Sequence, residues 1–314
     1  PRKNFEISMK GIEEGDFTMV LGYPGTTNQY IYSDALRILL ESTLPHRIDL
    51  RTSRLNVMDS YMNASEKVKL QYASKYRRVS NAWKKWKGVI RGLERIDGVE
   101  VKRQEEADFV EWMKEDDLRV FKYDRLLPGF KKAYGEMEKY SLVVTYLNEA
   151  VYAVELFAEI SSLNRLMAQG IAADVIRSHI KGFFKDYHAL IDQDIFARMM
   201  KAYYTHIDPA FHPEFFSVVQ DKYKGNFEAF AEDTYGKTVF SSSERLAKLV
   251  ATYESNPKKA LKKLSKDPLQ GFMADFRKIY LVKVAPEKER LQSEIDALYR
   301  DYMTALREQA DTVH

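Results

Sequence analysis

Aromatic and aliphatic residues recur at alternating steps of four and three between residues 72 and 93. The positions in this series are Tyr72, Tyr76, Val79, Trp83, Trp86, Ile90 and Leu93. Such steps place side chains on one face of an α-helix, and two apolar residues in every seven form a narrow stripe that packs on a second helix. The sequence therefore predicts a long helix that belongs to an antiparallel hairpin or a bundle.

Helical spacing continues through most of the remaining chain. Further helices are predicted at about 32–43, 47–62, 103–114, 128–139, 172–187, 192–206 and 213–233, and from about 244, 257, 268 and 286. Pro45 is expected to end the first of these helices, because proline cannot donate to the helical hydrogen-bond ladder. The apolar run 141–167 predicts one central buried helix that ends at Gly170. The fold class is therefore mainly α, with one large, bundle-like helical domain.

Residues 1–30 carry a β pattern instead. Phe5, Ile7 and Met9 alternate with polar residues. The run 15–21 first alternates and then becomes apolar, and it is bounded by glycine, so two strands are predicted. The following Pro24–Gly25 pair predicts a tight turn. Two strands cannot bury a face by themselves, so this segment is expected to complete a larger sheet. The predicted boundary separates residues 1–30 from a helical domain of residues 31–314.

Composition narrows the function classes. Over 314 residues, 45% hydrophobic and 30% charged residues are typical of a globular protein with a sizeable core. A net charge of +3 gives no global attraction to nucleic acid or to a membrane, and no apolar run reaches the length of a membrane span. The chain has no cysteine, which excludes disulfides and thiolate chemistry. No cofactor, nucleic-acid partner or membrane partner is expected.

The sequence contains no recognisable catalytic or metal-binding constellation. It has neither a Gly-x-Ser loop nor a glycine-rich phosphate loop. No two histidines have the four-residue helical spacing of a metal pair, and His206 and His212, which flank a proline-containing turn, are interpreted as ordinary histidines. Asp192 and Asp194 lack the glycine and the distal glutamate of a calcium loop, so helix N-capping is predicted there.

A basic run accompanies the aromatic stripe, and Glu94 is the acidic residue within it. Its members are Lys75, Arg77, Arg78, Lys84, Lys85, Lys87, Arg91 and Arg95. Interleaved tryptophans suggest a surface for nucleic acid or an acidic ligand. A solvated flank is favoured, because long cationic side chains commonly pack their stems beside an apolar stripe. Electrostatic steering of peptides towards a cleft is the remaining alternative.

Three stretches resemble a known family. Residues 15–28, GDFTMVLGYPGTTN, together with YASKY at 72–76 and SNAWKKWKG at 80–88, resemble the bacterial dipeptidyl-peptidase 7 and dipeptidyl-peptidase 11 family. These serine exopeptidases remove dipeptides from free peptide N-termini. Their fold combines a chymotrypsin-like double β-barrel with a helical domain inserted between the parts that carry the triad.

The resemblance implies that residues 1–30 end the barrel and that residues 31–314 form the inserted helical domain, a cap that gates substrate access. The parent would be a serine-type dipeptidyl-peptidase, exported to the periplasm, and this chain without the triad would be inactive. Its partners would be peptide substrates and the remaining barrel. The aromatic surface also allows a homodimer, and a free-standing helical interaction module is the alternative function.

The resemblance also implies a substrate-binding position. In the family an asparagine on the linking loop accepts from the peptide α-amino group, and Asn28 matches it, with Gln29 as a weaker neighbour. Thr26 stands where many relatives carry arginine. The alternative is that Asn28 only caps the helix expected from about Tyr30. The pocket for the side chain next to the cleaved bond would lie in the barrel, so this sequence predicts no preference.

Overall fold

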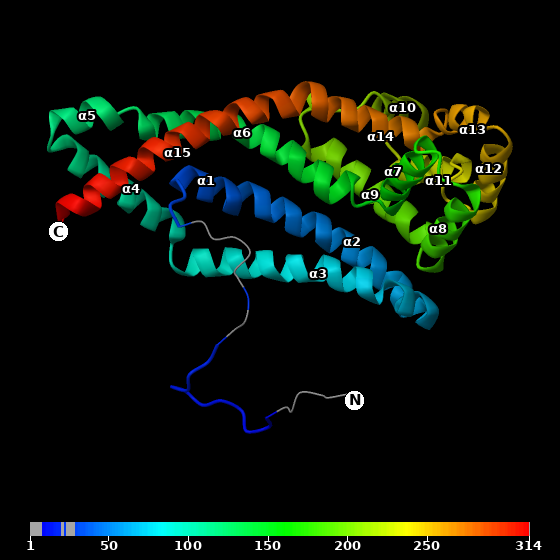
Figure 1. Cartoon of the computed structure of the whole chain (residues 1–314), viewed down its shortest axis with the longest axis horizontal. Helices are drawn as coiled ribbons and strands as arrows, with labels where there is room; N and C mark the ends of the chain where they lie inside the picture. The colour runs from blue at the N-terminus through cyan, green and yellow to red at the C-terminus, as the bar shows by residue number, and fades with distance from the viewer. Residues whose placement is uncertain (1–7, 20–21, 23–28, 314) are drawn as a thin grey trace. The chain divides into compact units, whose positions relative to one another are not determined.

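The computed structural model of the chain describes residues 8–19, 22 and 29–313. It divides into two units, Pro1–Ile31 and Tyr32–His314. The second unit is helical almost throughout, which confirms the predicted mainly α class (Figure 1).

The first unit differs from the prediction. Its described residues form no strand, and the apolar side chains of Met9, Ile12, Phe17 and Met19 are exposed. A strand needs a hydrogen-bonded neighbour and a face to bury, and the described part of this segment makes no such pairing. Residues 8–19 therefore form no strand in this chain, which does not contain the larger sheet they were expected to complete, and the expected turn at Pro24 lies outside the described residues.

The predicted hairpin is present. Helices α2 (Leu44–Ala64) and α3 (Glu66–Arg95) are joined through Ser65, whose hydroxyl accepts from the Val68 N–H at 3.4 Å. Figure 1 shows the two helices side by side. The stripe on α3 faces α2, where the Trp83 indole donates to Thr52 Oγ1 at 2.9 Å. Side-chain spacing therefore identified both the helix and its partner face.

Pro45 does not separate two helices. A π-helical turn, η1 (Leu39–Thr43), connects α1 (Ser33–Ile38) to α2, and Pro45 occupies the first turn of α2. A second π turn, η4 (Tyr280–Val284), likewise connects α14 (Pro268–Ile279) to α15 (Ala285–Val313) just before Pro286. The wider turn removes the usual i−4 acceptor from the register, so proline's missing N–H costs little there.

The run 141–167 is not one helix. It is divided between α6 (Leu126–Tyr146), the π turn η2 (Leu147–Val151) and α7 (Glu155–Ala168). The bend between the two helical segments is 86°. The prediction of a single buried helix was wrong because a distant carboxylate, Asp192, accepts hydrogen bonds from the first N–H groups of α7.

The remaining helices follow in short steps. Their bounds are α4 (Gly98–Lys114), α5 (Asp117–Tyr123), α8 (Ala173–Lys185), α9 (Ala189–His206), η3 (Pro209–Phe211), α10 (Phe215–Tyr223), α11 (Phe227–Lys237), α12 (Ser243–Ser255) and α13 (Pro257–Leu264). The helix expected over 213–233 is broken, because Lys224 and Gly225 adopt the left-handed conformation at φ 53° and 77°.

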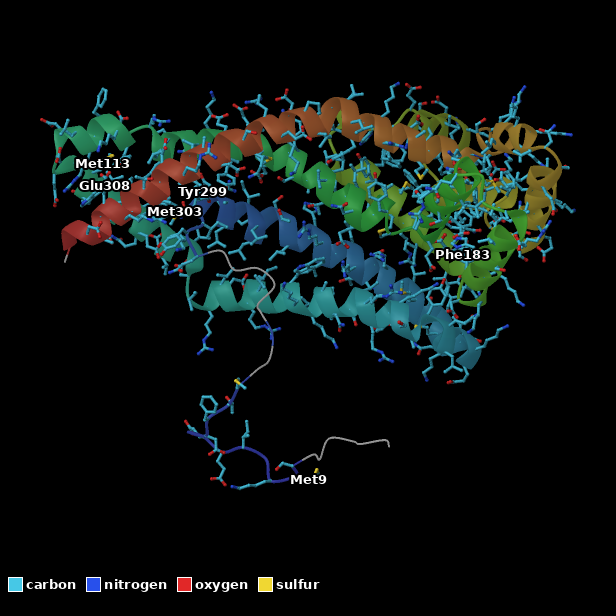
Figure 2. The ribbon with its side chains drawn as sticks, in the orientation of Figure 1. Met9, Met113, Phe183, Tyr299, Met303 and Glu308 are labelled. Atoms are coloured by element: carbon cyan, nitrogen blue, oxygen red, sulfur yellow. The ribbon has the colours of Figure 1, made fainter. Side chains whose placement is uncertain are left out.

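Two hydrophobic cores hold the helical unit together. The smaller one joins α1, α4, α5, the first half of α6 and α15, and the larger one fills the rest. Figure 2 marks Tyr299 and Glu308 on α15 in the smaller core region. Tyr299 accepts from the Tyr32 N–H at 3.0 Å and Glu308 from the Tyr123 hydroxyl at 2.7 Å. These contacts hold α15 against the start of α1 and the end of α5.

Among the residues described, no single helix is long and apolar enough to cross a bilayer. One bent pair, Asp117–Val151 with Glu155–Ala168, meets the length and composition test.

Candidate functional site

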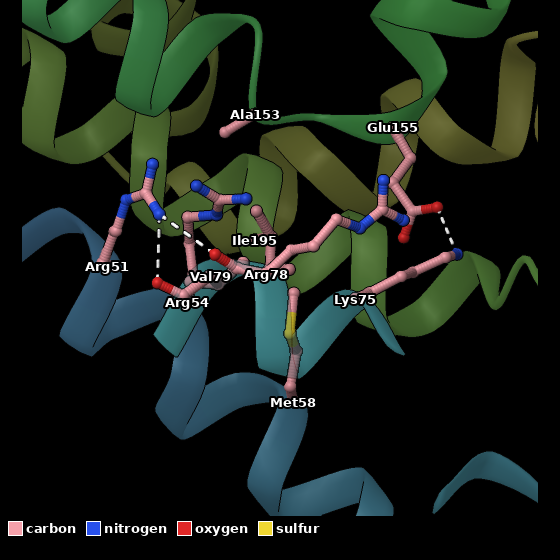
Figure 3. A pocket seen from close by; sticks show the side chains of 9 residues that line it. All are labelled: Arg51, Arg54, Met58, Lys75, Arg78, Val79, Ala153, Glu155 and Ile195. Atoms are coloured by element: carbon pink, nitrogen blue, oxygen red, sulfur yellow. Dashed lines mark hydrogen bonds and ion pairs between the residues drawn. The ribbon is translucent and has the colours of Figure 1, made fainter. Parts of the chain in front are cut away.

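A cationic pocket lies where the α2–α3 hairpin meets the bend between α6 and α7. Its volume is about 300 Å³. The lining residues are Arg51, Arg54, Met58, Lys75, Arg78, Val79, Ala153, Glu155 and Ile195 (Figure 3). Four of these side chains are cationic, and they come from consecutive turns of α2 and α3. We call this the cationic pocket.

Arg51 closes one side of the pocket. Its guanidinium binds both oxygens of Glu149, Nε to Oε2 at 2.8 Å and Nη2 to Oε1 at 2.9 Å. Its Nη1 donates to the Val79 carbonyl at 3.0 Å, and the group lies 4.4 Å from the centre of the Trp86 ring. A bidentate ion pair combined with stacking on an aromatic ring holds an arginine side chain in one conformation. Arg51 is therefore a structural clamp between the hairpin and η2.

Arg54 has far fewer partners. Its side chain is 12% exposed, and its Nη1 lies 3.7 Å from Glu149 Oε2, beyond hydrogen-bond distance. Its Nε is buried without a hydrogen-bond partner in the described part of the chain. Burial lowers the pKa of this guanidinium, with Glu149 opposing that effect. The site thus contains a desolvated cation with unused donors, which is costly unless something satisfies them.

Lys75 and Glu155 close the opposite side. The Lys75 ammonium pairs with Glu155 Oε2 and donates to the Asp186 carbonyl. Glu155 Oε1 accepts from the buried hydroxyl of Tyr72 at 2.8 Å. Burial and the charge of Glu155 raise the pKa of that phenol far above its ordinary value. Each oxygen of Glu155 is therefore held by one side chain from the same face of α3.

The fourth cation, Arg78, is exposed, and its guanidinium makes no ion pair or hydrogen bond with any residue that the structure describes. Figure 3 shows the guanidinium groups of Arg54 and Arg78 between Arg51 on one side and the Glu155–Lys75 pair on the other. Four cations thus face two carboxylates, Glu149 and Glu155. The arrangement can bind an anion.

A buried carboxylate supports the pocket from behind. Asp192 on α9 is fully buried, and it accepts from the N–H groups of Glu155 at 2.7 Å and Leu156 at 3.2 Å. Its Oδ2 also accepts from the hydroxyls of Tyr235 at 2.8 Å and Tyr187 at 3.5 Å. Burial and the charge of Glu155 raise the pKa of Asp192 to about 7. This residue positions the start of α7 and hence Glu155.

Capping was predicted for Asp192, but it caps a different helix. The sequence suggested the N-terminus of its own helix, whereas the side chain lies inside the first turns of α9 and reaches α7. Asp194 accepts from the Tyr61 hydroxyl at 2.7 Å instead. Both carboxylates are thus occupied by tertiary contacts.

The basic run divides between two roles. Lys75 and Arg78 line the cationic pocket, whereas Lys84 and Arg91 are exposed along α3 as a solvated flank. Sequence reasoning missed Arg51, Arg54 and Glu149. Arg47, Arg51 and Arg54 recur at helical spacing, which was an available signal for a basic face on α2.

The predicted substrate-binding residues are not tested here. Asn28 lies outside the described residues, and Gln29 is exposed in the first unit. No group of three histidine, aspartate or glutamate side chains in the described ranges could hold a metal ion. His212 Nε2 lies 2.7 Å from the Ile207 carbonyl, and His206 packs at 5.3 Å from the ring of His46, so both occupy ordinary local contacts.

Comparison with known proteins places this helical unit. A curated Asp/Glu-specific dipeptidyl-peptidase of Flavobacterium psychrophilum is 32% identical over 320 residues, which cover 97% of this chain and 43% of that protein. A dipeptidyl-peptidase 7 of Porphyromonas endodontalis is 26% identical, over 96% of this chain and 36% of that protein. The chain therefore spans less than half the length of these curated relatives.

Solved structures share the fold. The crystal structure of Porphyromonas endodontalis DPP11 matches 96% of this chain and 43% of its own, with a TM-score of 0.79 at 23% identity. The same protein in complex with the dipeptide Arg-Glu matches 92% of this chain and 41% of its own, with a TM-score of 0.75 at 22% identity. The family model described as Peptidase S46 matches residues 1–313. The suspected resemblance is thus confirmed, and the chain belongs to the peptidase S46 family.

Proposed function

We propose that this chain is the helical, substrate-gating part of a serine dipeptidyl-peptidase that removes dipeptides from free peptide N-termini. The observation that carries the proposal is the family match over the whole chain, combined with curated relatives that are dipeptidyl-peptidases more than twice as long. Acyl transfer by a serine peptidase needs a nucleophile, a base and an oxyanion hole held together. In this proposal those groups belong to the rest of the parent protein.

The construction of the helical unit supports a gating role. Besides its apolar packing, the α2–α3 hairpin makes ion pairs with the rest of the unit at two places, Arg51 with Glu149 and Lys75 with Glu155. Both carboxylates belong to the bent connection between α6 and α7. Ion pairs at the edge of a pocket exchange more readily than a dry apolar interface. The hairpin also contributes Leu50, Met58 and Tyr72 to the larger core, so a gating movement must carry that part of the core with it.

The activity is tested on the gene product that contains this chain. Dipeptide release is measured by mass spectrometry with a peptide whose N-terminus is free and with its N-acetylated form. The longer protein is expected to release dipeptides from the free form only and to be stopped by a serine-directed inhibitor, whereas the 314-residue chain releases none. Release by the 314-residue chain, or no release by the longer protein, would refute the proposal.

Gating is tested separately by amide hydrogen exchange. In the longer protein, a bound peptide should slow exchange in residues 44–95 relative to the peptide-free state, because a closing hairpin loses solvent access. The last helix, residues 285–313, is the internal control. If exchange in the hairpin does not change when the peptide is saturating, the gating role is refuted. The peptidase assignment would not be affected by that result. Export to the periplasm belongs to the same proposal and is tested by fractionating the producing cells.

A further inference from the structure

The cationic pocket has more positive charge than its own carboxylates use. Arg51 is committed to Glu149, and Lys75 to Glu155. Arg54 shares Glu149 at the longer distance of 3.7 Å and keeps a buried Nε without a hydrogen bond, and Arg78 is exposed without a partner among the described residues. A buried guanidinium donor without a hydrogen bond is unfavourable, because losing that bond costs more than making it gains. Arg47, outside the pocket, has such a donor too, so the pocket is distinguished by the unpaired Arg78 beside Arg54. The surplus points to a missing anion.

The geometry defines the kind of anion. A planar guanidinium presents paired donors that match a carboxylate, whose two oxygens accept side by side. The cavity of about 300 Å³ is at the small end of the range for ligand sites. It holds one side chain or one chain end, and Met58, Val79 and Ile195 provide apolar contacts for the adjoining methylenes. A short carboxylate-bearing segment fits this description.

We propose that Arg54 and Arg78 bind a carboxylate of the peptide substrate, carried by an acidic side chain or by the peptide C-terminus, outside the dipeptide that is removed. This inference rests on the proposed function for the peptide nature of the ligand. Glu155 is the one carboxylate among the lining residues, and it is paired with Lys75, while the nearby Glu149 is paired with Arg51, so neither cancels the attraction. The cationic pocket of the helical unit therefore favours peptides that carry a negative charge at the position that reaches it.

The experiment measures peptide binding to the 314-residue chain by isothermal titration at low ionic strength. Three amino-terminally free probes differ in where they carry a carboxylate: Gly-Gly-Gly-Gly-Glu amide has an acidic side chain, Gly-Gly-Gly-Gly-Gly has a free C-terminus, and Gly-Gly-Gly-Gly-Gln amide has neither. The first two are expected to bind and the third is not. Binding of only one of the first two identifies the carboxylate source, and equal binding of all three overturns the proposal.

Variants locate the site. Arg78→Ala should weaken binding of the acidic probe about 10- to 100-fold, the loss of one charge-assisted hydrogen bond. Arg91→Ala removes an exposed cation from the same helix outside the pocket and should change the affinity by less than about twofold. Because Arg54 is buried, Arg54→Met is included with its fold checked by circular dichroism, and Arg78→Ala carries the test if that variant unfolds.

Other outcomes separate this inference from the proposed function. Equal affinities for Arg78→Ala and Arg91→Ala would overturn the pocket, as would binding of inorganic phosphate without any peptide binding. Dipeptide release by the longer protein without binding of either carboxylate probe would overturn the inference alone. Binding that depends on Arg78, together with no dipeptide release, would overturn the proposed function and retain the anion site.

Discussion

Replacing Asp192 with asparagine isolates the electrostatic cost of the carboxylate behind the cationic pocket. The side chain is fully buried and accepts from the N–H groups of Glu155 and Leu156 at 2.7 Å and 3.2 Å and from the Tyr235 hydroxyl at 2.8 Å. Asparagine has the same shape and keeps one acceptor oxygen, but it does not titrate. Any difference in pH dependence between the two proteins therefore comes from Asp192 together with its interaction with Glu155.

The raised pKa of Asp192 determines whether stability rises or falls with pH. Burial, reinforced by the charge of Glu155, raises the pKa of Asp192 from 3.8 to about 7 in the folded chain. Between these values the folded state keeps a proton that the unfolded state has lost, so stability falls as the pH rises. The stabilisation is complete below about pH 4 and is lost as the pH passes through 7. Over about three pH units, at about 1.4 kcal/mol each, the change is up to about 4 kcal/mol.

Urea unfolding between pH 4 and pH 8 measures this change. The free energy of unfolding of the native protein relative to Asp192→Asn should decline by up to about 4 kcal/mol from pH 4 to pH 7 and then level off. Asp208→Asn is the control, because Asp208 is an exposed cap that accepts from the Ala210 N–H at 2.8 Å and asparagine caps equally well. The difference in the free energy of unfolding between Asp208→Asn and the native protein should not change with pH. If the free energy of unfolding depends on pH in the same way in Asp192→Asn and in the native protein, the raised pKa of Asp192 is refuted.

Three further predictions concern contacts elsewhere. Glu149→Ala should lower the free energy of unfolding by about 3–5 kcal/mol, because it leaves buried guanidinium charge uncompensated, as measured by urea unfolding. Trp83→Ala should cost about 2 kcal/mol, since this half-buried ring packs on the core and donates to Thr52, while Arg91→Ala should cost under about 0.5 kcal/mol; the reverse order would show that the faces of α3 are wrongly assigned. In the longer protein, Asn28→Ser should lower kcat/KM for free-amine dipeptidyl substrates about 10-fold or more without loss of stability, and an unchanged value would reduce Asn28 to a cap.

The helices were predictable because their causes are local. The stripe from Tyr72 to Leu93 identified α3 and its packing face, since side chains three and four apart share one side of a helix. Gly170, at φ 69°, follows α7 just after its C-cap, Gln169, as a helix-ending glycine should. Local patterns also placed the main α class. They did not place the strands of the first unit, whose existence depends on a sheet that residues 8–19 cannot supply alone.

The cationic pocket was not predictable for the opposite reason. Arg51 and Glu149 are 98 residues apart, and Lys75 and Glu155 are 80 apart, so no periodicity within one segment relates them. The basic run was found, yet its division into pocket and flank depends on which turn of α3 faces the bend after α6. The available local signal was the helical spacing of Arg47, Arg51 and Arg54, which indicates a basic face on α2 but not its partners.

The bend itself explains why a pocket exists at this place. An uninterrupted helix through 141–167 would present Glu149 and Glu155 on different faces, because six residues correspond to about one and two-thirds turns. The π turn η2 and the short link to Val154 break that relation, and the Asp192 carboxylate fixes the start of α7 after the break. Each glutamate then meets a different cation of the hairpin, Arg51 or Lys75. Arg54 and Arg78 occupy the space between these two pairs. A substitution at Asp192 should therefore change the affinity for an anion more than it changes the packing of the distant core around α15.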